Sequence, residues 1–232
     1  MTKCVILQPS YIPWRGYFHQ IALADIFVFY DDVKYDKNGW RNRNKIKTPN
    51  GPMWLTIPVL TKGVETKKTP INEIHIDRSK KWTNKHINAI TTSYSKAPFF
   101  KEYSPAIFDY LNVKTELLVD ITIDLTIHLS KMLGIKNTKF IRSSTMKSIE
   151  GKKTKRIVQI LQNLGIDHYI SGPSAQSYIK EEEFTSTGIK IEYMDYVYSE
   201  YPQFYPPFES FVSIIDLLFM TGPDALSFIM NT

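Results

Sequence analysis

The stretch CVILQPSYIPWRGYFHQIALADIFVFYDDV, residues 4–33, decides the fold class. Its first apolar run, 4–8, is stopped by Pro9 and predicts a short buried strand. Residues 16–25 then place apolar side chains at helical spacing, and 26–33 is rich in the β-branched and aromatic residues that are typical of strands. A strand, a helix and a second strand in this order predict the opening of a parallel βαβ sheet.

The rest of the chain continues this alternation. Asn50-Gly51 is a hairpin turn signal between two alternating segments, at about 40–47 and 53–59. Further strands are expected at 71–77, 138–144, 168–172 and 188–196, and helices after residue 80 and at about 104–111, 115–133, 154–165 and 208–222. We therefore predict an α/β fold with a largely parallel, Rossmann-like sheet flanked by helices. It forms one domain over residues 1–232, with a β-hairpin and a helical insertion at about 80–133.

The composition is that of a globular protein that favours anionic partners. Of 232 residues, 43% are hydrophobic and 13% aromatic, and 29 basic against 23 acidic residues give a net charge of +6. This surplus favours phosphates, nucleotides or acidic proteins. No nucleic-acid recognition motif accompanies it, so DNA and RNA are not predicted partners. The single cysteine, Cys4, and the lack of a signal-peptide pattern or a membrane-length apolar run predict a cytoplasmic protein without membrane insertion.

Polar residues follow four of the predicted strands. They are Gln8-Pro9-Ser10-Tyr11, Asp31-Asp32, Arg142-Ser143-Ser144 and Ser171-Gly172-Pro173-Ser174. If the sheet is parallel, all four strand ends meet at one edge, where ligands of α/β proteins bind. The amino end of a helix at Gly16 lies there too, and its free N–H groups favour an anion.

His19, Asp31 and Asp32 are the predicted catalytic residues, as candidates for a general base. The alternative for the Asp pair is a solvated strand end, and the alternative for His19 is a structural histidine on its helix. The remaining histidines stand singly, without metal-ligand spacing, so no metal site is predicted.

Basic and aromatic residues around these strand ends are the predicted binding residues. Arg41, Arg43 and Lys45 suit phosphate or carboxylate, although the same pattern is typical of a charged, exposed hairpin. The full predicted binding set is Gln8, Tyr11, Trp14, Gly16, Tyr17, Tyr35, Trp40, Arg41, Asn42, Arg43, Lys45, Arg142, Ser144, Ser171, Gly172, Ser174, Tyr178 and Gln203.

With these residues in view, the sequence resembles the WbqC-like protein family. The first block that carries the resemblance is QPSYIPWRGYFHQIALADIFVFYDDVKY with the following WRNRNKIK and WLTIPV, within residues 6–59. The second, within 169–223, contains YISGPSAQSYI, a later YPQ and IDLLF. The resemblance implies a product of a surface-polysaccharide (O-antigen, lipopolysaccharide) gene cluster.

The resemblance further implies an N-acyl- or aminoacyltransferase that acts on the amine of a nucleotide-linked amino sugar. In this hypothesis Arg41, Arg43 and Lys45 hold the phosphates, and His19, Asp31 or Asp32 takes a proton from the amine. The donor is an acyl-CoA or an acyl or aminoacyl carrier protein, and no other cofactor is implied. The alternatives are a non-catalytic nucleotide-sugar-binding or pathway scaffold protein, and an ATP-dependent adenylating ligase.

A second similarity concerns the fold alone. Nucleotidylyltransferase-like folds carry an HxGH motif between the first strand and helix and an SST-type motif late in the chain. Here Trp14-Arg15-Gly16-Tyr17 occupies the first place, and Arg142-Ser143-Ser144-Thr145 resembles the second. Both signature histidines are absent, so ordinary nucleotidyl transfer is not expected even if the fold is shared.

Overall fold

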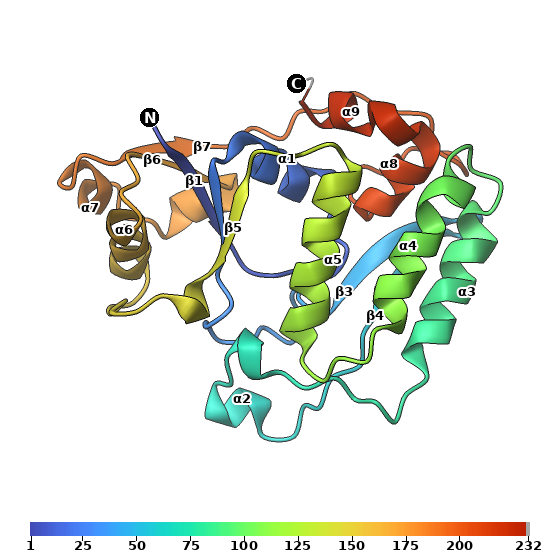
Figure 1. Cartoon of the computed structure of the whole chain (residues 1–232), viewed down its shortest axis with the longest axis horizontal. Coiled ribbons are helices and arrows are strands. Elements are labelled where there is room, and N and C mark those ends of the chain that lie inside the picture. The colour runs from blue at the N-terminus through green and yellow to red at the C-terminus, as the bar shows by residue number, and fades with distance from the viewer. Residues whose placement is uncertain (231–232) are drawn as a thin grey trace.

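The computed structural model describes residues 1–230 and contains two sheets (Figure 1). The larger sheet has five strands in the order β5-β2-β1-β6-β7, and every neighbouring pair is parallel. Their bounds are β1 Lys3–Leu7, β2 Ile26–Phe29, β5 Lys139–Arg142, β6 His168–Ser171 and β7 Lys190–Tyr193. The predicted α/β fold with a largely parallel sheet is confirmed.

The strand order reverses at β1. Strands β2 and β5 extend the sheet on one side of β1, whereas β6 and β7 extend it on the other. In an open parallel sheet such a reversal leaves a crevice beyond the carboxyl ends of the two strands that meet there. Those strands are β1 and β6, which end at Leu7 and Ser171.

Alternate residues of each strand face two different apolar cores. Val5 and Phe27 belong to the larger core, whereas Cys4, Ile6 and Val28 belong to the smaller one. Because both faces of the sheet are covered, the strands appear in the sequence as continuous apolar runs rather than as alternating ones.

Helices cover both faces of this sheet. The larger core contains side chains from α1 (Arg15–Leu23), α5 (Leu118–Met132) and α8 (Ile214–Thr221). The smaller core contains side chains from α6 (Thr154–Asn163) and α7 (Glu182–Thr185), which lie across the sheet from α5 in Figure 1. The burial of these amphipathic faces supplies most of the stability of such a layered fold.

The segment between β2 and β5 forms a second layer of structure beside the sheet (Figure 1). It holds the antiparallel hairpin of β3 (Arg43–Thr48) and β4 (Gly51–Thr56), and then α2 (Val64–Lys67), the 3₁₀ turn η1 (Ile71–Glu73), α3 (Trp82–Tyr94), α4 (Phe100–Asn112) and α5. The remaining short elements are η2 (Ser143–Thr145), η3 (Pro173–Ser177), η4 (Gly222–Leu226) and α9 (Ser227–Met230).

The hairpin turn is shifted by one residue from its predicted position. Thr48 pairs with Gly51, so Pro49 and Asn50 occupy the centre of the turn rather than Asn50 and Gly51. Gly51 has φ 94°, which only glycine adopts without strain. Thr48 Oγ1 accepts from Asn50 N at 3.2 Å and donates to Gly51 O at 2.7 Å, which closes the turn.

Three elements differ from the sequence prediction. No strand forms at 71–77, because neighbouring residues of this segment pair with two different parts of the chain: Ile76 bridges to Val59 and His75 bridges to Leu117. Strand β2 ends at Phe29, where the N–H of Asp31 donates to Phe29 O at 3.0 Å and turns the chain. The last long helix begins at Ile214 rather than at 208, and the residues before it, 196–213, form an irregular strap with several bends. Of the helices in residues 1–230, none combines the length and the apolarity needed to span a membrane.

Candidate functional site

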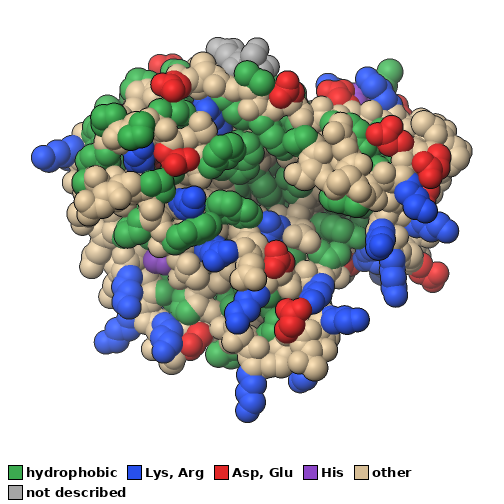
Figure 2. All heavy atoms as spheres, turned by 180° about the vertical axis from the view of Figure 1, so that it is seen from behind, with side chains coloured by type: hydrophobic (Ala, Val, Ile, Leu, Met, Phe, Trp, Pro, Cys, Tyr) green, Lys and Arg blue, Asp and Glu red, His purple; other side chains and the backbone are tan. Residues whose placement is uncertain are grey.

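A cleft of about 1070 Å³ opens at the carboxyl ends of β1 and β6, where the strand order reverses. On the face seen in Figure 2, hydrophobic side chains gather around a central hollow, and Lys and Arg side chains lie beside it. Half of the predicted binding residues line the cleft: Gln8, Trp14, Tyr17, Trp40, Arg41, Ser171, Gly172, Ser174 and Tyr178. The sequence prediction missed further lining residues, among them Gln20, Tyr30, Lys153, Tyr196 and Phe211.

The loop after β1 is held in place by the start of the hairpin. Tyr11 N donates to Trp40 O at 3.2 Å, and Asn44 Nδ2 donates to the carbonyl oxygens of Tyr11 and Ile12 at 3.2 and 2.8 Å. These bonds stabilise the unusual φ of 35° at Ile12. As a result Trp40 and Arg41, which are distant from Gln8 in sequence (33 residues for Arg41), lie against the end of β1.

Arg41 brings a positive charge into the cleft without a carboxylate partner. Its Nη1 donates to Gln8 Oε1 at 2.8 Å, while Nε is enclosed and makes no hydrogen bond within residues 1–230. No acidic side chain in the described chain forms an ion pair with it. Burial lowers the pKa of the Arg41 guanidinium, which nevertheless stays protonated at neutral pH. An unpaired and desolvated cation favours an anionic ligand.

Aromatic rings form one wall of the cleft. The Trp14 ring centroid lies 5.0 Å from that of Tyr196 and 5.3 Å from that of Phe211. Trp40 is 42% exposed, and its ring lies 5.1 Å from that of Trp54, which is also 42% exposed. Such faces can stack on a sugar or a nucleobase. The strap contributes Tyr196 and Phe211 to the cleft lining.

Gly16 is not among the residues that line the cleft, but it contacts Trp14, which is. A Cβ at Gly16 would lie 2.3 Å from Trp14 Cζ2, so the indole packs directly on the first turn of α1. Gly16 is thereby the reason that the Trp14 ring can lie flat against the helix and still reach the cleft.

Gln20 and Tyr196 meet inside the cleft, although they are far apart in the sequence. Gln20 Nε2 donates to Tyr196 Oη at 2.6 Å, and Gln20 Oε1 is a buried oxygen without a partner among the described residues. Burial raises the pKa of Tyr196 to about 12, so its hydroxyl is neutral at physiological pH. Gln20 lies one helical turn beyond Gly16 in α1. Its partner Tyr196 follows a strand on the other side of β1, and no feature of the sequence indicates that the two residues are in contact.

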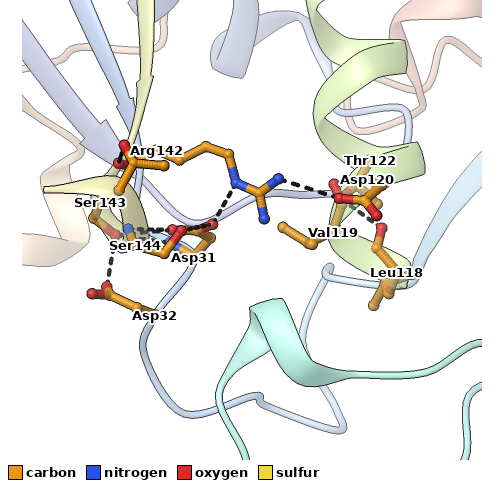
Figure 3. Close-up of polar contacts among 10 residues, drawn as sticks. Asp31, Asp32, Leu118, Val119, Asp120, Thr122, Arg142, Ser143 and Ser144 are labelled. Carbon is orange, nitrogen blue, oxygen red and sulfur yellow. Dashed lines mark hydrogen bonds and ion pairs between the residues drawn. The ribbon is translucent and has the colours of Figure 1, made fainter. Parts of the chain in front are cut away.

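Asp31 is enclosed in a cluster at the ends of β2 and β5 (Figure 3). Its Oδ1 accepts from Ser144 N at 2.9 Å and lies 3.1 Å from Ser143 Oγ, whose single hydrogen is donated to Asp32 at the shorter distance of 2.6 Å. Its Oδ2 accepts from Arg142 Nε at 2.8 Å and from Ser144 Oγ at 2.7 Å. Oδ1 therefore receives one hydrogen bond and Oδ2 two, and the cluster joins two neighbouring strand ends.

Asp32 and Arg142 join this cluster to α6 and α5. Asp32 pairs with Arg156 Nη2 at 2.5 Å and accepts from Ser143 Oγ at 2.6 Å. Arg142 Nη1 reaches Asp120 Oδ1 at 3.2 Å, which ties the cluster to the first turn of α5 (Figure 3). The four strand ends do meet at one edge, but those of β2 and β5 pair with each other, while those of β1 and β6 face the cleft.

His19 lies outside the cleft lining. It is 6% exposed, and its Nδ1 lies 2.9 Å from Tyr198 Oη. Burial lowers its pKa, which favours the neutral imidazole. The three predicted catalytic residues are therefore separated: His19 lies beneath the strap, and Asp31 and Asp32 lie in the cluster of Figure 3.

Six further predicted binding residues lie away from the cleft. Tyr11 is buried and bonds to His86 Nδ1 at 2.8 Å, Tyr35 is buried, and Asn42 Nδ2 donates to Ile57 O at 2.7 Å. Arg43 and Lys45 lie over the Trp54 ring, at 4.6 and 5.2 Å from its centroid. Gln203 Nε2 donates to the buried carboxylate of Asp216 at 2.8 Å, which anchors the strap to α8.

The cleft is equipped to bind an anion and an aromatic or sugar ring, and to exchange hydrogen bonds with uncharged groups. No Asp, Glu or His is among its lining residues within 1–230. In the same part of the chain no three His, Cys, Asp or Glu side chains are grouped as metal ligands would be.

Comparison with known proteins gives one family and one uncharacterised relative. The model of the WbqC-like protein family matches residues 8–228. A protein of Mycobacterium tuberculosis (strain ATCC 25618 / H37Rv) named "Uncharacterized protein Rv1507c" is 40% identical over 227 residues, which cover 97% of this chain and 96% of the relative. No solved structure matches the chain significantly.

Proposed function

The chain belongs to the WbqC-like protein family, and from this membership and the geometry of the cleft we propose that it binds a nucleotide-linked amino sugar and transfers an acyl or aminoacyl group to its amine. Membership suggests a role linked to the proteins of surface-polysaccharide gene clusters. The donor would be an acyl thioester, carried by coenzyme A or by a carrier protein.

Arg41 is the observation that carries this proposal. A guanidinium that has lost part of its hydration and has no carboxylate partner raises the free energy of the empty protein. A diphosphate would supply the missing charge, with Arg41 Nη2 and Gln8 Nε2 as donors that have no partner within residues 1–230. The rings of Trp14, Trp40 and Tyr178 would contact the sugar and the base.

The size of the cleft supports two substrates rather than one. Its volume of about 1070 Å³ slightly exceeds the roughly 300–1,000 Å³ that small-molecule sites occupy. A nucleotide sugar and the reactive end of an acyl thioester can therefore be held side by side, and this proximity lowers the barrier to transfer.

The transfer reaction needs no side chain of the protein to keep the proton that the amine loses. The amine nitrogen forms a bond to the acyl carbon, the carbon–sulfur bond breaks, and the proton released by the nitrogen ends on the leaving thiolate. Our proposal therefore assigns no proton transfer to His19, Asp31 or Asp32, which lie outside the cleft lining.

One test is to incubate the protein with UDP- and dTDP-linked amino sugars and several acyl thioesters, and to follow the nucleotide sugar by mass spectrometry. We expect an amide product from one pair, and nucleotide-sugar binding by calorimetry that Arg41→Gln weakens at least tenfold. Lys101→Gln, which removes the same charge from an exposed position of α4, is the matched control. A protein that binds no nucleotide sugar would contradict the proposal.

A second candidate, a non-catalytic nucleotide-sugar-binding protein, is favoured by a different observation. The cleft has no acidic or imidazole side chain among its described lining residues, as expected of a site that only binds. Tight, Arg41-dependent binding without product from any thioester donor would favour this candidate.

A further inference from the structure

Gln20 lines the cleft and carries a hydrogen-bond acceptor that no described residue uses. Its side chain is 3% exposed, and it belongs to the cleft lining. Nε2 donates to Tyr196 Oη at 2.6 Å, but Oε1 has no partner among residues 1–230. A buried carbonyl oxygen without a partner is destabilising, so a ligand that donates a hydrogen bond here would be bound selectively.

Tyr196 presents the complementary donor. Its hydroxyl oxygen accepts from Gln20 Nε2, and its own hydrogen has no acceptor within the described chain. Because burial raises the pKa of Tyr196 to about 12, the hydroxyl keeps this hydrogen at neutral pH. The hydroxyl can therefore donate to a carbonyl oxygen.

The backbone at Gly172 fixes where this hydroxyl lies. A Cβ on Gly172 would come within 3.3 Å of Tyr196 Oη, so the hydroxyl lies directly over the residue that follows β6. Gln20 reaches the same point from α1, which follows β1. The acceptor and the donor thus lie at the reversal of the strand order, where a ligand of this fold is expected.

We propose that Gln20 and Tyr196 form a subsite for a secondary amide, in which Gln20 Oε1 accepts the N–H and Tyr196 Oη donates to the C=O. This inference rests on the proposed function and names the place of the reacting atoms: the sugar amine lies at Gln20 and the acyl carbonyl lies at Tyr196. One neutral acceptor next to one neutral donor matches an amide, whereas a carboxylate or an ammonium would leave one of the two unpaired.

In the transfer step this subsite would act on the tetrahedral intermediate. The amine attacks the thioester carbonyl, a nitrogen–carbon bond forms, and the carbonyl oxygen becomes negatively charged. Tyr196 Oη donates to that oxygen, while Gln20 Oε1 holds the nitrogen through its hydrogen. The oxyanion then collapses, the carbon–sulfur bond breaks with its electron pair going to sulfur, and the thiolate takes the proton lost by nitrogen. A single donor to such an oxyanion typically contributes roughly 10²–10³-fold to the rate.

The test compares two nucleotide sugars that differ only at nitrogen, the free amine and its N-acetyl amide. For wild-type protein, Tyr196→Phe, Gln20→Met and Gln20→Glu, both dissociation constants are measured by calorimetry, with melting temperatures as a check of folding. Tyr198→Phe is the matched control, because Tyr198 lies next to Tyr196 at 6.3 Å between ring centroids but is not part of the cleft lining.

We expect Tyr196→Phe to weaken binding of the amide about tenfold and of the amine less than threefold, since only the amide has a carbonyl oxygen. Gln20→Met should weaken the binding of both ligands. Gln20→Glu keeps an acceptor oxygen and should therefore bind the amine as tightly as the wild type does. Tyr198→Phe should leave the ratio of the two constants as in the wild type.

Two outcomes separate this inference from the proposed function. If no donor yields product but Tyr196→Phe still weakens amide binding selectively, the subsite stands and the transferase proposal fails. If product forms at wild-type rate in Tyr196→Phe and Gln20→Met, and the binding ratio is unchanged, the transferase stands and the subsite is overturned.

Discussion

Arg41 Nη1 donates to Gln8 Oε1 at 2.8 Å, and among residues 1–230 no carboxylate lies within ion-pair distance of this guanidinium. Arg142 and Arg156, by contrast, are both paired with carboxylates, those of Asp31 and Asp32. The sheet edge therefore has a neutralised half beside β2 and β5 and a positively charged half beside β1 and β6. An anion is attracted to the second half.

Arg41 and Arg43 should differ when each is replaced with Gln. Both were predicted to bind substrate, but Arg41 lines the cleft whereas Arg43 lies over Trp54 on the hairpin. We expect Arg41→Gln to weaken nucleotide-sugar binding at least tenfold, and Arg43→Gln to weaken it less than threefold. The melting temperature of Arg41→Gln without ligand should be unchanged or raised, because an unpaired, desolvated charge is removed. Equal losses of binding in the two variants would place the anion on the hairpin instead.

Asp31→Asn should destabilise the protein more than Asp32→Asn. Asp31 is fully buried and its two oxygens accept three hydrogen bonds, so an amide nitrogen would face a donor and leave Arg142 less well paired. We expect a loss of about 2–4 kcal/mol in the free energy of unfolding, measured by urea denaturation. Asp32 is partly exposed, and its replacement should cost about 1 kcal/mol.

The same two variants test the predicted roles of these residues as bases. Because neither lines the cleft, folded Asp32→Asn protein should retain both binding and turnover. Turnover abolished at an unchanged melting temperature would show instead that Asp32 takes the proton.

The sequence predicted the sheet well because its signals are local. The apolar runs of β1 and β2, with the helix between them, indicate a parallel pair without knowledge of the rest of the chain. Parallel strands in turn place all strand ends at one edge, so Gln8 and Ser171 were predicted to meet, and they line the same cleft. Elements that depend on distant partners were missed, as at 71–77, where two bridges to different segments replace a strand.

The position of the cleft was harder to predict, because it depends on which charged residues at the strand ends form ion pairs with each other. Asp31 and Arg142 are both polar residues at strand ends, like Gln8 and Ser171, yet the first two bond to each other. Only the strand order, with β2 next to β5, decides this pairing. Tyr196 was missed because its role depends on Gln20, 176 residues away in the sequence.

Gly172→Ala should lower amide binding without loss of stability. Gly172 has φ −71° and ψ 154°, which alanine adopts readily, so the unfolding free energy should stay the same or rise by up to about 1 kcal/mol. The added methyl group would lie 3.3 Å from Tyr196 Oη and displace the hydroxyl by a few tenths of an ångström, roughly the tolerance of a preorganised site. We expect several-fold weaker binding of the N-acetyl ligand by calorimetry. Unchanged affinity would mean that the hydroxyl does not contact the amide.

His86 should make stability depend on pH below neutrality. Burial lowers its pKa from 6.5 to about 4, and Nδ1 and Nε2 already lie 2.8 Å from Tyr11 Oη and 3.2 Å from Thr56 O. Since Thr56 O can only accept, Nε2 carries the hydrogen and Nδ1 accepts from Tyr11, so protonation of Nδ1 would break that bond.

The sign of the effect follows from the two pKa values. Between pH 6.5 and about 4 the unfolded chain binds a proton at His86 that the native protein does not, so the free energy of unfolding falls as the pH falls. The contribution of this residue is about 3 kcal/mol over the whole interval and vanishes below about pH 4, where both states are protonated. Urea denaturation at several pH values should show a shallower slope for His86→Phe than for the wild type, whatever the offset between the two curves. Parallel curves, or an NMR titration of the wild-type imidazole with a midpoint near 6.5, would show that His86 accepts its proton in the folded protein without penalty.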